Sequence, residues 1–178
     1  MKSLSLIVIL SVALPALAFA QADPAVQVEF TGTDTGLGML APPPTITQDG
    51  GTLHMRGFNG YSHIVLRRAD SSTLFDGIGT FSLNANWSTT DFTGPVWGPF
   101  RMADAAGNTA EMTCNAVRAV IEPGTWQSVF HCTGVGTGGT IDGNLFRLTE
   151  TITTHVPIPA DFVGVITGSM VEPAHPNH

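Results

Sequence analysis

Histidines and cysteines are the side chains of this sequence best suited to metal binding, acid–base catalysis or redox chemistry. Apart from His175 and His178 at the C-terminal end, they are His54, His63, His131 and His155 in separate segments, with Cys114 and Cys132 as the two cysteines. Four imidazoles could form a zinc site or an acid–base pair. None of them stands at a recognised ligand spacing, so we expect hydrogen-bonded or solvated histidines and no metal site.

The local motifs of common enzymes are missing from the sequence. It holds no G-x-S-x-G elbow, no H-E-x-x-H pair, no phosphate-binding loop of the Walker type and no EF-hand loop. Residues 134–139 match G-x-G-x-x-G, but a dinucleotide site needs a helix after these glycines, and residues 140–152 have a strand pattern. We therefore predict no cofactor, and expect the glycines to let a strand coil at a barrel corner.

The two cysteines lie in a segment whose sequence pattern predicts a β-hairpin. Residues 112–118 and 126–132 alternate in character, and a Pro123-Gly124 turn separates them. Antiparallel pairing centred on Pro123 places Cys114 directly opposite Cys132, at a spacing that a disulfide spans. We predict that disulfide, worth about 3 kcal/mol in the chain-entropy model. Two unpaired buried cysteines are the alternative.

The same register separates the hairpin into two faces. Ala116 falls opposite Phe130 on the cysteine face, while Asn115 falls opposite His131 on the other. One face is thus apolar and the other polar, as in a half-buried strand pair.

Residues 1–20 have the composition of a signal peptide. Lys2 is followed by an apolar run over residues 4–17, and Ala18 and Ala20 supply the small residues before a cleavage site. We predict cleavage after Ala20 and a secreted or periplasmic protein. No later stretch approaches the roughly 18–20 apolar residues of a membrane span, so we expect no transmembrane segment.

The remaining chain has the length of one domain. We expect a single domain over residues 21–178, with short flexible tails at 21–25 and 171–178. The formal charge of −7 becomes −8 when Lys2 leaves with the signal peptide. This excess of negative charge argues against nucleic acid and anionic membranes as partners. The sequence leaves the oligomeric state open.

Short alternating segments recur along the whole chain. They cover residues 26–30, 52–56, 62–67, 78–87, 96–102, 112–118, 126–132, 145–152 and 162–167. Residues 57–60 contain Asn-Gly, which favours a tight reversal between two of them. With no clear helical stripe, the pattern predicts an all-β fold: a single antiparallel β-barrel of about eight strands, or alternatively a β-sandwich.

Residues 126–150 carry the pattern W-x-x-x-F-x-C-x-G-x-G-T-G-G-x-x-D-G-x-x-x-x-x-x-E. This run resembles the glycine-rich strand pair of secreted barrels similar to allene oxide cyclase and dirigent proteins, and the resemblance extends over about residues 77–150. It implies an eight-stranded barrel with a ligand cavity. No motif matches the catalytic residues of those families, so no active site is carried over.

The favoured function is a non-catalytic exported barrel that binds a small apolar or amphipathic molecule in its interior. The candidate ligand-binding residues are Trp87, Trp97, Phe100, Asn115, Trp126 and His131. An isomerase or cyclase acting in the same cavity, with His131, Asn115 or Glu111 polarising a substrate, is one alternative. A structural or envelope-associated protein acting through its surface is another.

Overall fold

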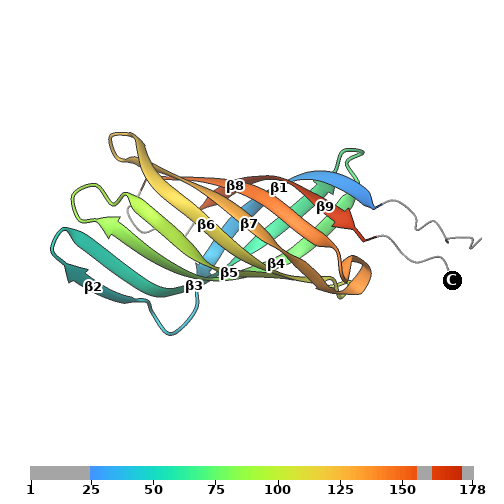
Figure 1. Cartoon of the computed structure of the whole chain (residues 1–178), viewed down its shortest axis with the longest axis horizontal. Coiled ribbons are helices and arrows are strands. Elements are labelled where there is room, and N and C mark those ends of the chain that lie inside the picture. Colours follow the sequence, from blue (N-terminus) through green and yellow to red (C-terminus); the bar gives the residue numbers. More distant parts are fainter. Residues whose placement is uncertain (1–24, 156–161, 174–178) are drawn as a thin grey trace, which may run out of the picture.

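The computed structural model describes residues 25–155 and 162–173, almost entirely as β-strands (Figure 1). The elements are β1 (Val26–Met39), β2 (Thr45–Asp49), β3 (Thr52–Arg68), β4 (Thr73–Ser88), β5 (Gly94–Asp104), β6 (Thr109–Glu122), β7 (Thr125–Gly138), the short 3-10 turn η1 (Gly139–Ile141), β8 (Leu145–Thr154) and β9 (Val163–Glu172). The predicted signal peptide lies outside the described residues. Strand β9 runs two residues into the expected C-terminal tail, since Val171 pairs with both Gln27 and Leu145.

The sheet closes on itself. Its strands follow the order β1-β9-β8-β7-β6-β5-β4-β3, and β1 also pairs with β3 from Phe30↔Arg68 to Met39↔Gly60. The prediction of an eight-stranded antiparallel barrel is thus confirmed, and the sandwich is excluded. Strand β2 is an additional ninth strand, which pairs with the first residues of β3.

Strand β3 corrects one sequence prediction. The expected reversal at residues 57–60 does not occur, because β3 continues through them. Gly57 takes a positive φ of 68°, and the pairing with β4 skips from Met55 to Phe58. A glycine in this conformation accommodates extra residues as a β-bulge without turning the chain. His54 and His63 therefore lie on one strand, and do not face each other across a hairpin.

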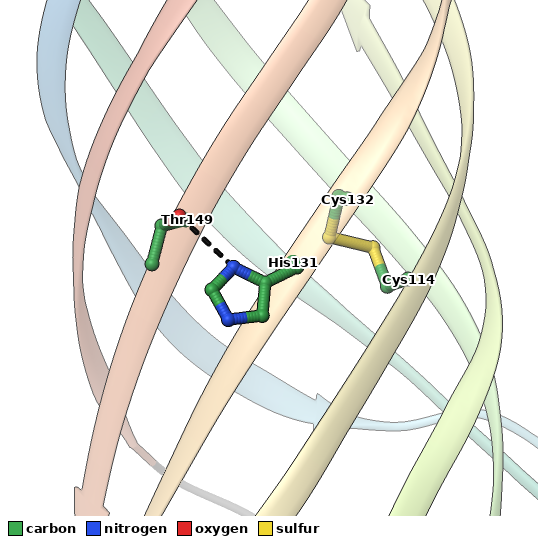
Figure 2. Close-up of a disulfide and its surroundings, with 4 residues drawn as sticks. All are labelled: Cys114, His131, Cys132 and Thr149. Carbon is green, nitrogen blue, oxygen red and sulfur yellow. Dashed lines mark hydrogen bonds between the residues drawn. A yellow bond between two sulfur atoms is a disulfide. The ribbon is translucent and has the colours of Figure 1, made fainter.

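The cysteine hairpin folds in the predicted register. Cys114 pairs with Cys132 and Asn115 with His131, and the two sulfurs form a disulfide across 18 residues of sequence. Figure 2 shows this disulfide between neighbouring strands, with His131 beside it. The apolar face points into the barrel, since both cysteines are buried while Asn115 and His131 are exposed.

The glycine-rich run does not form a nucleotide site. Residues 134–138 complete β7, and Gly139 begins the three-residue turn η1. A Cβ atom added at Gly136 would overlap the backbone of Ile141, so close backbone approach accounts for that glycine.

The two ends of the barrel differ. At the end called here the β2 end, β2 and the first part of β3 project beside the turns at residues 89–93 and 123–124 (Figure 1, left). The opposite end carries the turns at residues 69–72, 105–108 and 139–144 and both termini of the described barrel. Buried side chains pack the half near this opposite end: Phe30, Ile64, Leu66, Phe75, Met102, Ala110, Met112, Ile141, Phe146, Leu148, Ile166 and Met170.

Candidate functional site

The half of the barrel near the β2 end contains a cavity of about 80 Å³. Its lining is mainly apolar and aromatic: Met55, Phe58, Phe81, Leu83, Trp87, Val96, Phe100, Cys114, Phe130, Ile152 and Phe162. Polar or charged side chains complete the wall: Asp34, Arg118, Ser128, Glu150 and Thr154. Phe81, Leu83 and Phe162 are only half-buried, so the cavity extends toward the surface.

Two acidic side chains meet in the cavity wall. Asp34 on β1 is 1% exposed and Glu150 on β8 is 7% exposed. Strand β9 lies between them, and Gly164 is the β9 residue that pairs with Asp34. A Cβ atom at Gly164 would overlap Oε1 of Glu150, so this glycine leaves the space in which the Glu150 side chain crosses β9. Two strands that are not neighbours thereby bring their carboxyl groups together.

The pair is held in a partly protonated state. Burial raises the pKa of Asp34 to about 6, partly offset by the hydroxyl of Ser62, a hydrogen bond with Glu150 and the charge of His63. Burial also raises the pKa of Glu150 well above its usual range, and the charge of Asp34 and the hydrogen bond with it add to this effect. The pair therefore holds a proton more tightly than two separate carboxyl groups would.

The polar atoms of this pair have few partners. Apart from the contacts of Asp34 with Ser62 and with Glu150, the buried oxygens Asp34 Oδ1, Glu150 Oε1 and Ser62 Oγ have no hydrogen-bond partner in the described part of the chain. Burying a polar group with too few partners costs free energy. The carboxyl groups of Asp34 and Glu150, which line the cavity, are therefore placed to accept further hydrogen bonds from a bound molecule.

Arg118 forms a second polar feature of the cavity, closer to the β2 end. Its guanidinium lies 4.8 Å from the ring centroid of Trp87 and 5.1 Å from that of Trp126, and it donates to Thr154 Oγ1 over 3.3 Å. Burial lowers the pKa of Arg118 to about 10, which leaves it charged at neutral pH. The two indoles compensate part of the cost of burying this charge.

Three of the predicted ligand-binding residues belong to this region. Trp87 and Phe100 line the cavity. Trp126 packs against Arg118, and its indole N–H donates to the carbonyl oxygen of Asp91. These three aromatics are therefore placed to shape the cavity or its mouth.

The other three predicted residues lie on the outer face of the barrel. Trp97 packs there under the guanidinium of Arg56, 5.3 Å from the ring centroid. Asn115 and His131 are exposed, and His131 Nδ1 shares a hydrogen bond of 3.2 Å with Thr149 Oγ1 (Figure 2). These side chains do not line the cavity.

Glu111, considered with His131 and Asn115 for an isomerase, is also on the outer face. Its carboxylate pairs with the exposed Arg101, 3.2 Å from Nε. A reaction in the cavity cannot use any of these three residues.

Comparisons with protein-family models, with curated proteins and with solved structures find no match to this chain. The resemblance to allene oxide cyclase-like and dirigent-like barrels therefore stays a prediction. Among the described residues, no three potential metal ligands are grouped, and no helix has the length and apolar character needed to cross a membrane.

Sequence reasoning missed Asp34, Glu150 and Arg118, although a signal for Glu150 and Arg118 exists. Both occupy inward positions in alternating strands: Glu150 follows Phe146 and Leu148 at intervals of two residues, for example. A charged residue at a position where the alternation predicts a buried side chain costs folding free energy unless a partner group compensates its charge. Such a residue therefore marks a candidate site.

Proposed function

We propose that the protein binds a small amphipathic molecule in the half of the barrel near the β2 end. The apolar part of the ligand lies among the aromatic side chains, and its polar group meets Asp34 and Glu150. The observation that carries this proposal is a mainly apolar cavity wall that contains two buried carboxyl groups in contact with each other. Structural acids of this kind are rare in an apolar core, whereas binding pockets combine apolar walls with a few convergent polar groups.

The cavity limits the size of the ligand. Its volume of about 80 Å³ compares with about 150 Å³ for a cavity known to bind benzene. By this comparison the ligand part inside the barrel has about three or four non-hydrogen atoms.

Titration with 1-propanol, followed by the backbone amide NMR spectrum, tests this proposal. We expect saturable shifts at residues around the cavity, such as Gly164 and Gly36. Ser128→Leu fills the cavity and should abolish them, while Thr133→Leu, on the outer face of the same strand, should not. Native mass spectrometry of protein from its source should detect a small bound mass. Absence of both a bound mass and saturable shifts would reject the proposal.

Export is part of the proposed function. A disulfide is consistent with an extracytoplasmic location, because reducing systems keep cytosolic thiols free. We expect the mature protein to begin at Gln21, as read by N-terminal sequencing of material from its source. An uncleaved Met1 on native protein would contradict this expectation.

A proton-transfer enzyme is a second candidate, supported by one observation at the same pair. The pKa of Asp34 is raised to about 6, and the pKa of its neighbour Glu150 is raised well above its usual value. Such pairs can act as general base and general acid on a small carbonyl compound. The test is deuterium exchange next to the carbonyl of acetone in D₂O. Exchange that depends on Asp34 supports this candidate, and exchange no faster than in Asp34→Asn rejects it.

A further inference from the structure

We propose that the cavity is selective for a small primary amine, bound as its ammonium ion between Asp34 and Glu150. This inference rests on the proposed function and specifies its ligand class. Three features carry it: the acceptor oxygens of the carboxyl pair, the aromatic walls, and the placement of Arg118.

The first feature is the match between donors and acceptors. The buried oxygens Asp34 Oδ1, Glu150 Oε1 and Ser62 Oγ have no hydrogen-bond partner in the described part of the protein beyond the contacts of Asp34 with Ser62 and with Glu150. An alkylammonium ion carries three N–H donors, an alcohol carries one and a carboxylate ion carries none. Only the ammonium can therefore supply a donor to each oxygen. Hydrogen bonds between charged groups are also stronger than neutral ones.

The second feature is the aromatic wall around the pair. Phe58 and Phe81 stack with their ring centroids 5.9 Å apart, and Phe162 lies 6.1 Å from Phe81. The backbone of Phe162 accepts a hydrogen bond from Gly36 N on β1, the strand of Asp34. The faces of aromatic rings carry partial negative charge and attract ammonium groups when water is excluded. The wall thus suits a cation that has an apolar tail.

The third feature is the location of the one cationic side chain in the cavity lining. Arg118 belongs to β6 and is stacked between Trp87 and Trp126. Burial is the cause of its lowered pKa. The guanidinium thus packs against two indoles toward the β2 end, and the acid pair supplies the negative group that a bound cation can meet.

The experiment compares n-propylamine, 1-propanol and propionate, which share one chain length and differ in charge. Each is titrated into the disulfide-intact protein at pH 7.5, and the dissociation constant is read from backbone amide shifts. We expect propylamine to bind at least about tenfold more tightly than propanol, because charge-assisted hydrogen bonds from the ammonium replace the single neutral hydrogen bond that an alcohol can donate. Propionate should bind most weakly.

Variants of the pair locate the effect. Glu150→Gln and Asp34→Asn should each weaken propylamine binding by about tenfold and change propanol binding by less than about twofold. Glu111→Gln, which removes a carboxylate from the outer face, should leave both constants unchanged. If a variant of the pair does not fold, the comparison of ligands on the unmodified protein decides alone.

The outcomes separate this inference from the proposed function. Equal binding of propanol and propylamine overturns the amine selectivity and leaves the binding function standing. Tightest binding by propionate also overturns it, and would point to Arg118 as the anchor. If none of the three ligands binds, the proposed function fails together with this inference.

Discussion

Glu150 reaches Asp34 across the backbone of Gly164, the residue of β9 that separates their two strands. Charged pairs in a sheet usually join neighbouring strands, as Arg101 and Glu111 do on the outer face. The buried pair instead depends on closure of the barrel and on one missing side chain. The site therefore exists only in the folded protein, and its geometry can be tested at the glycine.

Gly164→Ala should destabilise the protein and separate the acids. The added methyl group overlaps Glu150 Oε1 and forces that side chain to move, at a cost of about 1–3 kcal/mol. Urea denaturation measures this cost. Gly51→Ala is the matched control, because a Cβ atom at Gly51 meets no atom within 4 Å. Equal stabilities of the two variants would contradict the arrangement described here.

Stability should fall as the pH rises. A buried carboxyl with a raised pKa binds its proton more tightly in the folded than in the unfolded chain, so the contribution of Asp34 to stability is complete below about pH 3.8 and is lost as the pH rises through about 6. For Asp34, a rise in pKa from 3.8 to about 6 corresponds to about 3 kcal/mol. Glu150, with its pKa also raised, extends the loss to higher pH. Urea denaturation from pH 4.5 to 8.5 measures the slope.

Two controls isolate the pair in that measurement. Asp34→Asn combined with Glu150→Gln should flatten the pH dependence. His63 affects Asp34 and bonds to Asp76 on the outer face, 2.8 Å from Nε2 to Oδ1, so His63→Gln measures how far this neighbour influences Asp34. A slope that survives the double change would assign the pH dependence to other groups.

Removal of the disulfide should cost about 3 kcal/mol in the free energy of unfolding. The bond closes a loop over 18 positions, and both Cys114 and Cys132 are buried. Cys114→Ala with Cys132→Ala should show this loss in urea, while the folded spectrum is retained because strand pairing continues around the bond. An unchanged midpoint would mean that the bond does not constrain the unfolded chain.

Arg118→Lys should destabilise the protein by about 1–2 kcal/mol despite the retained charge. A lysine ammonium cannot stack its plane between Trp87 and Trp126 as the guanidinium does. Thermal unfolding gives the stability, and a shift in tryptophan fluorescence reports the changed contact. Arg101→Lys, at an exposed ion pair, should change stability by less than about 0.5 kcal/mol.

The fold could be predicted from the sequence where local pattern decides the structure. Alternation and a Pro-Gly turn predicted the hairpin of β6 and β7 to the residue, including Cys114 opposite Cys132. The pattern failed at residues 57–60, because an Asn-Gly pair fits a bulge as well as a reversal. Closure by β1 and β3 is a long-range pairing that no local signal encodes.

The candidate site was predictable only in part. Trp87 and Phe100 were predicted because aromatic residues commonly line barrels, and both do line the cavity. The same reasoning wrongly placed Trp97 in the cavity. Trp97 stands between the inward residues Val96 and Gly98, so its side chain points to the outer face. Asp34 was missed because its neighbours in sequence are mainly threonines and glycines. Few apolar residues are present there to show which side of the strand faces the interior. Its partner Glu150 is 116 positions away, and only the closed sheet brings the two together.

The tightly packed half of the barrel limits how a small molecule can pass through the protein. The buried side chains of Phe30, Phe75 and Phe146, with their neighbours, fill one end of the barrel. The barrel is therefore closed at that end and cannot act as a channel. A molecule bound in the cavity would therefore enter and leave on the side of the β2 end, where the half-buried Phe162 lines the cavity.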